Sequence, residues 1–255
     1  MTDFLRLETT GPVARLIINR PRKKNAFLHE MWAALPNLVD QAMSNDHVRV
    51  LILAASGGDA FSAGADIEEF GAHAGDVEWG KANQTAIRSS QYALARAPKP
   101  TIALIEGVCI GGGCGLAIAC DLRVSGPRAR FGITPARLGI VYSLHDTKLL
   151  VDLVGPSQAK RILFTAGLLP AEESHRIGLV DLLGDDPRTM ANELAETIAE
   201  NSPHSIAGTK RTVRRILGGQ VDDDEDTLSD FRSAFQGPDY REGVAAFIEK
   251  RTAKF

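Results

Sequence analysis

The sequence predicts an α/β protein whose C-terminal quarter is helical. Two long apolar runs, "VRVLILAA" at 48–55 and "TIALIE" at 101–106, are typical of strands buried on both faces. A segment with helical character lies between them at about 78–97, and this alternation of strand and helix favours parallel pairing. Past about residue 185 the strand patterns stop. Helical segments follow there instead, at 187–201, 204–217, 224–235 and 239–250.

The remaining elements follow from the same periodicities. "FLRLETT" and "VARLIIN" alternate apolar and polar residues around Gly11-Pro12, which predicts a hairpin. Helical spacing over 28–43 predicts a helix that Pro36 kinks or breaks. The other expected elements are a strand in "DLRVSG" and helices at 113–120, 144–154, 156–165 and 171–176. We therefore divide the chain into a core domain, residues 1–190, and a helical region, residues 191–255.

The bulk composition excludes some classes of protein. The chain has 255 residues, of which 44% are apolar and 24% charged, enough for one sizeable buried core. A formal net charge of −3 gives no electrostatic argument for nucleic-acid binding. The N-terminus does not read as a signal peptide, and no apolar run is long enough to span a membrane. We expect a cytoplasmic protein that binds neither nucleic acid nor membrane.

Three cysteines, Cys109, Cys114 and Cys120, lie in or beside one apolar segment. None forms a C-x-x-C pair, and their gaps do not suit a zinc site. Free cysteine often behaves as a small apolar residue in a core. We therefore expect three buried thiols and no metal site.

Two loops that follow the two buried strands carry glycine where the chain turns. They are "FSAGAD" at 61–66 and "IGGGCG" at 110–115, and the second opens a predicted helix. Backbone N–H groups at a helix N-terminus favour negative charge, and two of them converging on one carbonyl oxygen would form an oxyanion hole. Close packing of a helix on a sheet also selects glycine. The second loop matches neither a P-loop nor the dinucleotide pattern G-x-G-x-x-G.

Five segments together resemble the crotonase superfamily, the enoyl-CoA hydratase/isomerase family, over nearly the whole chain. They are "NRPRKKNAF" (19–27), "AFSAGADIEEF" (60–70), "GGGCGLAIACDLRV" (111–124), "FGITPARLGI" (131–140) and "REGVAAFIEKR" (241–251). The resemblance implies a spiral of ββα turns and C-terminal helices that build a homotrimer, often paired into a hexamer. It also implies an acyl-CoA thioester as substrate, with coenzyme A as part of that substrate and no separate cofactor.

The resemblance also implies roles for individual residues. Ala65 and Gly112 match the positions whose N–H groups hold the thioester oxygen. Ala63, Ala65 and Ile67 match the adenine pocket, and Arg22 and Lys24 fall in the segment that lines the nucleotide of coenzyme A. Two C-terminal positions, Phe231 and Lys250, match residues that reach coenzyme A from a neighbouring subunit. The remaining expected substrate-binding residues are Ala26, Asp66, Gly111, Pro135 and Leu138.

Two positions depart from the family pattern. A hydratase of this family positions and activates water with two glutamates, and this chain has Gly115 and Pro135 at the matching positions. Neither residue can transfer a proton, whereas a general acid or base contributes about 10²–10⁴-fold. Ordinary enoyl-CoA hydration is therefore not expected unless other groups replace the two acids.

The segment "TPARLGIVYSLHDTKLL" supplies Tyr142, His145 and Asp146 as replacements. It resembles the methylmalonyl-CoA decarboxylase branch, in which a tyrosine matching Tyr142 lies beside the acyl group. That branch has a histidine where this chain has Ala65 and an acid where it has Gly115. We take Tyr142 and His145 as candidate catalytic residues. The structural alternatives are a core tyrosine, a locally bonded histidine and an aspartate that compensates a helix dipole.

The leading interpretation is an enzyme that stabilises a thioester enolate between Ala65 and Gly112. Decarboxylation is the first candidate reaction, because loss of CO2 forms an enolate without a base. One alternative is a hydratase or isomerase that uses another acid, and a second is an acyl-CoA-binding subunit with weak catalysis. RNA binding would need a basic face, and "RPRKK" and "KRTVRR" are each too short to supply one.

Overall fold

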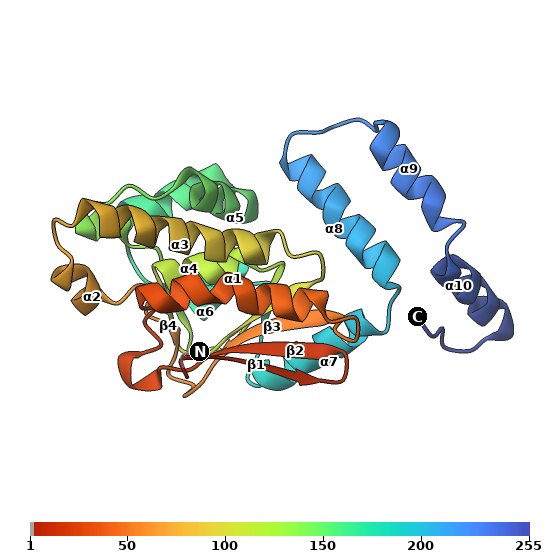
Figure 1. Cartoon of the computed structure of the whole chain (residues 1–255), viewed down its shortest axis with the longest axis horizontal. Helices are drawn as coiled ribbons and strands as arrows, with labels where there is room; N and C mark the ends of the chain where they lie inside the picture. Colours follow the sequence, from red (N-terminus) through yellow and green to blue (C-terminus); the bar gives the residue numbers. More distant parts are fainter. Residues whose placement is uncertain (1–2) are drawn as a thin grey trace.

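The computed structural model describes residues 3–255 and contains two β-sheets (Figure 1). The six-stranded sheet has the strand order β1-β2-β3-β5-β7-β10, and the four-stranded sheet has the order β4-β6-β8-β9. The first comprises β1 (Leu5–Thr10), β2 (Val13–Ile18), β3 (Val50–Ala55), β5 (Thr101–Ile105), β7 (Leu122–Ser125) and β10 (Leu182–Leu183). The second comprises β4 (Ala60–Ser62), β6 (Val108–Ile110), β8 (Arg130–Gly132) and β9 (Leu169–Pro170).

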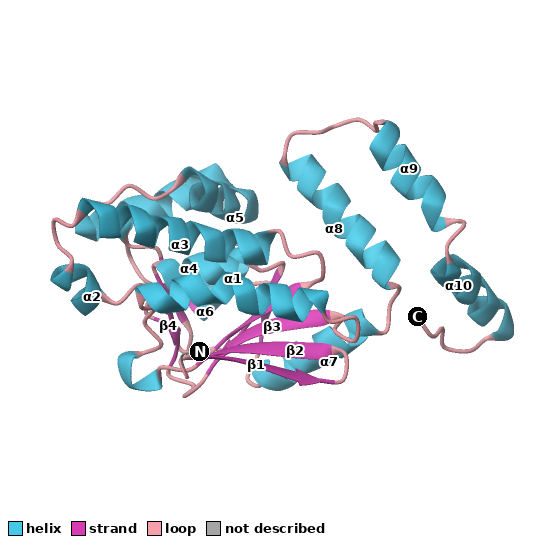
Figure 2. Ribbon diagram, viewed as in Figure 1, coloured by secondary structure: helices cyan, strands magenta, loops and turns pink. Residues whose placement is uncertain are grey.

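Helices cover the sheets and form the whole C-terminal region (Figure 2). Those up to the middle of the chain are α1 (His29–Ser44), α2 (Ile67–Ala72), α3 (Val77–Ala95) and α4 (Gly112–Ala119). They are followed by α5 (Leu144–Thr165), α6 (Ala171–Arg176), α7 (Pro187–Ala199), α8 (Pro203–Leu217), α9 (Glu225–Ala234) and α10 (Pro238–Glu249). Two short 3-10 helices, η1 (Pro21–Lys23) and η2 (Pro135–Leu138), lie in loops.

From β3 to β8, successive strands alternate between the two sheets and so wind into a spiral. β3, β5 and β7 pair in parallel in the first sheet, and the strand that follows each of them joins the second sheet. Helices then complete each turn, because α2 and α3 follow β4, α4 follows β6 and α5 follows β8. The predicted α/β fold with a ββα spiral is confirmed.

The large sheet is buried on both faces, which explains its uninterrupted apolar runs. Leu51 and Leu53 of β3 belong to the main core cluster, whereas Val50 and Ile52 belong to a second cluster on the other face. Helix α7 closes that second face with small buried residues such as Ala191. Residue 190, where we placed the end of the core domain, therefore lies within a helix that packs on the sheet.

Pro36 neither breaks α1 nor ends it, although the sequence predicts a kink or a break there. A proline lacks the N–H that would bond the carbonyl four residues earlier, here Trp32. The hydroxyl of Ser90, on α3, donates to that Trp32 oxygen at 2.6 Å. A neighbouring helix therefore satisfies the group that the proline leaves free. Helix α5 does contain the expected interruption, with a non-helical Gly155 (φ 73°, ψ 164°).

The helices α8, α9 and α10 lie to one side of the core in Figure 1, beyond α7. Lys210 ties α8 to the core through Asp121 at 2.5 Å, and the Arg49 guanidinium donates to the Phe255 carbonyl oxygen at 3.0 Å. Large apolar side chains are exposed on these helices in the single chain, among them Val213, Ile216, Phe231, Phe247 and Ile248. The predicted role of residues 191–255 in a trimer or hexamer stays a prediction.

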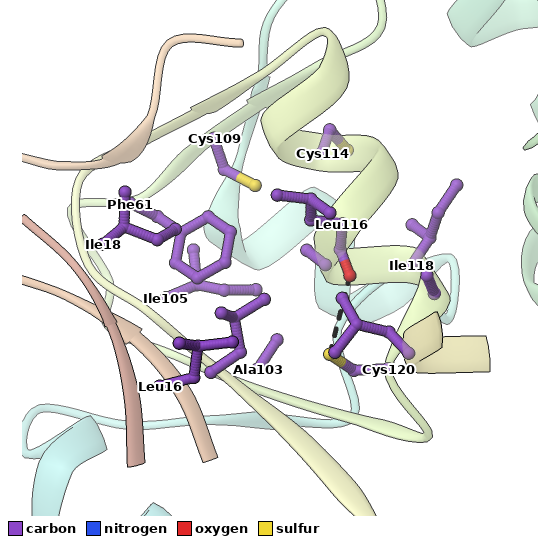
Figure 3. Close-up of a cluster of buried hydrophobic side chains, with 14 of the residues drawn as sticks. Leu16, Ile18, Phe61, Ala103, Ile105, Cys109, Cys114, Leu116, Ile118 and Cys120 are labelled. Carbon is purple, nitrogen blue, oxygen red and sulfur yellow. Dashed lines mark hydrogen bonds between the residues drawn. The ribbon is translucent and has the colours of Figure 1, made fainter. Parts of the chain in front are cut away.

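The three cysteines are buried among apolar side chains, as Figure 3 shows. Burial raises the pKa of the Cys109 thiol well above its usual range, and burial together with Asp121 raises the pKa of Cys120 to about 12. The Cys120 thiol contacts the Leu116 carbonyl oxygen at 3.5 Å. These two thiols stay protonated at neutral pH and act as packing groups.

Residues 3–255 contain neither a candidate membrane-spanning helix nor a candidate metal cluster. No helix in this part of the chain is both long and apolar enough to cross a bilayer. The same residues contain no group of three or more histidine, cysteine, aspartate or glutamate side chains arranged to hold a metal ion.

Candidate functional site

The two glycine loops predicted from the sequence lie against each other. Gly64, in the loop after β4, has a φ of 92°, a left-handed conformation that favours glycine. A Cβ atom there would lie 2.8 Å from the Ile110 carbonyl oxygen and 3.2 Å from the Gly112 nitrogen. Glycine at position 64 therefore lets this loop contact the start of α4 directly.

Ala65 follows Gly64, in a position where its own N–H donates no hydrogen bond to the described residues. It forms an isolated parallel bridge with Phe27, and the bonds of this bridge involve the neighbours of Ala65. The Phe27 N–H donates to the Gly64 oxygen at 2.8 Å, and the Asp66 N–H donates to the Phe27 oxygen at 2.9 Å. Within residues 3–255 the Ala65 N–H donates no hydrogen bond. Its nitrogen lies 4.0 Å from where a Cβ on Gly112 would be.

Gly112 is the first residue of α4, so its N–H has no partner inside the helix. Gly111 precedes it with φ 55° and ψ −125°, which requires glycine, and its N–H donates to the Gly132 oxygen at 2.8 Å. The Trp32 ring lies 3.0 Å from the position of a Cβ on Gly112. Among the residues that the structure describes, the Ala65 and Gly112 N–H groups donate no hydrogen bond and lie close together on two touching loops, and an oxyanion hole requires such a donor pair.

Buried polar groups hold the first loop in place. Asn25 is 1% exposed, and its amide donates to the Ser56 oxygen at 3.0 Å and to the Ala60 oxygen at 2.7 Å. The Arg20 N–H donates to the Asn25 side-chain oxygen at 2.8 Å, and the Ser62 hydroxyl donates to the Asn25 carbonyl at 2.8 Å. The bonds to Ala60 and Ser62 join the turn before α1 to β4, the strand before Ala65, and so help to fix the position of Ala65.

Asp66 belongs to the same hydrogen-bonded framework around the loop. Its carboxylate accepts from the Arg20 guanidinium at 2.5 Å and from the backbone N–H groups of Glu68 and Glu69 at the start of α2. Burial would raise the pKa of Asp66, but the bonds from Arg20 and the backbone outweigh it and lower the pKa. Asp66 therefore caps a helix and anchors the loop; contact with substrate stays a prediction.

A second group of residues meets one helical turn further along α4. Gly115 lies on the same side of α4 as Gly112, because residues three apart are neighbours on a helix. A Cβ on Gly115 would overlap the side-chain amide of Gln91, and it would lie 3.2 Å from the Tyr142 hydroxyl oxygen. Gln91 comes from α3 and is 1% exposed. We call Gln91, Gly115 and Tyr142 the polar wall.

Tyr142 brings an unpaired hydroxyl to this wall. Its oxygen is buried and has no hydrogen-bond partner among residues 3–255. Burial raises the pKa of Tyr142 well above its usual range, and the negative charge of Asp146 adds to this effect. The phenol is therefore neutral at physiological pH, and its O–H is available to donate a hydrogen bond.

Asp146, in the first turn of α5, is buried beside the polar wall. With the Gln91 amide oriented to suit its hydrogen bonds, its NH2 group donates to the two Asp146 oxygens at 2.5 and 3.0 Å. His145 Nδ1 lies 3.1 Å from one of these oxygens, and the imidazole packs against the Tyr92 ring. Asp146 thus connects Gln91 to His145, and Ser143, not Asp146, caps the helix.

Comparison with known proteins decides the family. A family model described as enoyl-CoA hydratase/isomerase matches residues 8–255. The chain belongs to the enoyl-CoA hydratase/isomerase family. The short-chain-enoyl-CoA hydratase of Clostridium acetobutylicum is 34% identical over 250 residues, which cover 96% of this chain and 94% of that protein. The crotonyl-CoA hydratase of Syntrophomonas wolfei subsp. wolfei is 32% identical over 255 residues, 98% of this chain and 96% of that protein.

Solved structures agree with this assignment. A crystal structure of an enoyl-CoA hydratase/isomerase family protein from Hyphomonas neptunium is 40% identical and has a TM-score of 0.96, covering 99% of this chain and 97% of that one. An enoyl-CoA hydratase structure from Bacillus anthracis is 30% identical, with a TM-score of 0.90 and 99% coverage of both chains. The resemblance drawn from the sequence is therefore confirmed at the level of the family and its fold.

The residues of the N-terminal half that the family pattern assigns to coenzyme A gather around the loop that contains Ala65. Arg22 and Lys24 are exposed in the turn before α1, and the Lys24 carbonyl accepts from the Ala63 N–H at 2.9 Å. Ile67 is exposed at the first turn of α2, whereas Ala26 is buried beside the loop. Their contact with coenzyme A stays a prediction.

Four other predicted residues lie outside these two groups. Phe231 belongs to α9 and Lys250 caps α10, and Figure 1 shows both helices on the opposite side of the core from α2 and β4. The family pattern has these two reach a neighbouring subunit, which stays a prediction. Pro135 and Leu138 lie in η2, between β8 and α5, and Leu138 is exposed. Their contact with substrate is likewise untested.

Sequence reasoning missed Gln91. The signal was present, because the buried face of α3 carries polar residues, Asn83, Ser90 and Gln91, where apolar ones are the norm. Ser90 bonds the Trp32 carbonyl, and Asn83 lies 3.1 Å from His29 Nδ1. A buried glutamine at such a position needs partners for its amide, and those partners identify what it faces.

We expect Gly115→Ala to destabilise the protein by about 1–3 kcal/mol, because the added methyl group overlaps the buried Gln91 amide. The matched control is Gly80→Ala on α3, where nothing lies within 4 Å of the added Cβ. That change should be neutral or stabilise by up to about 1 kcal/mol, since glycine disfavours a helix interior. Urea unfolding of both variants measures the difference, and equal stabilities would contradict the contact with Gln91.

Proposed function

We propose that this protein stabilises the enolate of an acyl-CoA thioester, and that loss of CO2 from a malonyl-type thioester forms this enolate. The observation that carries the proposal is the chemical character of the polar wall. Beside Gly115, where a hydratase of this family has a glutamate, the chain presents an amide and a protonated phenol. Neither group is a base at neutral pH, and decarboxylation needs no base to start it.

The proposed step balances without a cofactor. The bond between the α-carbon and the carboxylate breaks, CO2 leaves, and the electron pair moves into the thioester to give an enolate. The N–H groups of Ala65 and Gly112 stabilise the negative oxygen, an effect of about 3–4 kcal/mol for one such donor. A proton from water or from the Tyr142 hydroxyl then adds to the α-carbon, and solvent replaces it.

Hydration is the second candidate, because the relatives described above are named hydratases. It would require Asp146 and His145 to replace the two glutamates. The Asp146 oxygens accept from Gln91 and lie beside His145, and the groups nearest to Gly115 are the Gln91 amide and the Tyr142 hydroxyl, not the Asp146 carboxylate. This arrangement favours decarboxylation over hydration.

The deciding experiment is mass spectrometry of purified protein incubated with malonyl-, methylmalonyl-, crotonyl- and butyryl-CoA in deuterated buffer. Loss of CO2 from a malonyl-type ester, with one deuterium at the α-carbon, is the expected result. Gain of water by crotonyl-CoA without decarboxylation would overturn the proposal in favour of hydration. Binding of CoA esters without any mass change would overturn it in favour of a non-catalytic subunit.

We expect Tyr142→Phe to lower the decarboxylation rate by roughly tenfold, the effect of one hydrogen bond to a charged group. The hydroxyl has no partner in residues 3–255, so its removal breaks no bond within the protein. Thermal stability should therefore stay the same or rise slightly. A rate equal to that of the unaltered protein would show that Tyr142 is a core residue with no part in the reaction.

A further inference from the structure

Three elements that are far apart in the sequence meet at Gly115. Helix α3 contributes Gln91, α4 contributes Gly115 itself, and the loop before α5 contributes Tyr142. A Cβ on Gly115 would overlap the Gln91 amide, so this amide occupies the place where a longer side chain at 115 would begin. Because Gly112 lies one helical turn away on the same side of α4, the amide also lies near the two unpaired N–H groups.

The direction of the Gln91 amide is fixed by Asp146. An ionised carboxylate only accepts hydrogen bonds, so Gln91 must turn its NH2 group toward Asp146, at 2.5 and 3.0 Å from the two oxygens. The amide carbonyl is then the end that faces Gly115 and Tyr142. Asp146 is itself buried, and its side chain also lies 3.1 Å from His145 Nδ1.

We propose that Gln91 faces the α-carbon of the bound acyl group and takes the place of the carboxylate that this chain lacks at 115, with Asp146 as its positioning residue. The inference rests on the proposed acyl-CoA site between Ala65 and Gly112. It does not rest on decarboxylation. A neutral amide at this place orients polar groups of the substrate but cannot remove an α-proton. The chain is therefore suited to a reaction that forms the enolate without removing a proton.

The inference predicts a gain of function. In Gln91→Glu the new carboxylate replaces the amide and faces the α-carbon. It takes an α-proton, and the C–H electrons move into the thioester to form the enolate held by Ala65 and Gly112. The new carboxyl group exchanges its proton with D2O, and a deuteron then returns from it to the α-carbon. In D2O this exchanges the α-hydrogens of butyryl-CoA without any net reaction.

The matched control is Gln84→Glu, the same change on an exposed position of α3. We expect Gln91→Glu to exchange deuterium into butyryl-CoA at least about tenfold faster than both the control and the unaltered protein. This is less than the rate increase of about 10²–10⁴-fold that a well-positioned general base contributes. Circular dichroism and CoA-ester binding confirm that each variant is folded. A folded Gln91→Glu protein that binds butyryl-CoA and exchanges no faster than Gln84→Glu would overturn the inference.

A pH profile tests the role of Asp146 as a positioning residue. The titratable groups near position 91 are Asp146 and His145 of α5 and Tyr142, with Cys109 and Cys114 acting on Tyr142. Two carboxyl groups in contact hold a shared proton up to a higher pH than one alone. Exchange by Gln91→Glu should therefore reach half its maximum about one pH unit higher than exchange by Gln91→Glu combined with Asp146→Asn. Identical profiles would show that Asp146 does not contact this position.

The double variant also removes the like-charge contact, and it replaces the single variant if the latter fails to fold. The exchange assay and the decarboxylation assay separate the two proposals. If Gln91→Glu exchanges the α-hydrogens of butyryl-CoA while the unaltered protein releases no CO2, the position of Gln91 at the α-carbon is supported and decarboxylation is overturned. If the unaltered protein decarboxylates its substrate and neither folded variant exchanges α-hydrogens, decarboxylation is supported and the position of Gln91 at the α-carbon is overturned.

Discussion

Replacing Ala65 by proline is expected to lower kcat/KM for acyl-CoA turnover by about 10²–10³-fold. Proline has no backbone N–H, so one of the two proposed oxyanion donors is lost. The Ala65 N–H donates no hydrogen bond within residues 3–255, so its removal breaks no bond that holds the fold. Steady-state kinetics with the CoA ester that the substrate panel identifies, alongside thermal unfolding, measures both effects.

Ala65→Gly is the control for this change, because it alters the side chain and keeps the N–H. Its kcat/KM should stay within several-fold of the unaltered protein. If a folded Ala65→Pro protein turned over its substrate at the unaltered rate, Ala65 would not be an oxyanion donor. The donor pair would then have to be assigned elsewhere, with Gly112 as the remaining member.

The second large effect is expected at Gly64. Gly64→Ala places a side chain at a φ of 92° and a Cβ atom 2.8 Å from the Ile110 carbonyl oxygen. The left-handed conformation alone costs about 1–2 kcal/mol, and the overlap with main-chain atoms adds to it. We expect a loss of about 2–4 kcal/mol in the free energy of unfolding. Turnover should fall as well, because the Gly112 nitrogen must move away.

Gly75→Ala separates the two causes. Gly75 has a similar φ of 88°, but nothing lies within 4 Å of its added Cβ. This variant should lose only the conformational part, about 1–2 kcal/mol, and should keep its activity. Urea unfolding and kinetics on both variants provide the comparison. Equal losses at positions 64 and 75 would mean that the contact between the two loops contributes nothing.

The two halves of the site respond differently to changes in sequence. The donor pair consists of main-chain N–H groups, so it survives side-chain changes as long as glycine remains where the loops touch, at Gly64 and Gly111. The polar wall consists of side chains, so a few substitutions change what it can do. Family membership therefore establishes a thioester site more firmly than it establishes the reaction at that site.

Much of the fold could be predicted from local patterns. The strands β3 and β5 appear as apolar runs, and the predicted helix at 171–176 matches α6. The strands β4, β6 and β8 have three residues each, too few for a periodic pattern, and entered the prediction through the family resemblance alone. Pro36 shows the opposite case, in which a local signal for a break is overridden by a hydrogen bond from Ser90 on another helix.

The candidate site divides in the same way. Consecutive residues were enough to predict the two glycine loops, because turn chemistry is local, and the resemblance of five sequence motifs implied the family and its ββα spiral. The tertiary structure decided what stands opposite Gly115, since Gln91, Tyr142 and Asp146 come from segments that meet only when α3, α4 and α5 pack together. The buried carboxylate of Asp146 then fixes the direction of the Gln91 amide, and that direction depends on contacts between side chains that no local pattern records.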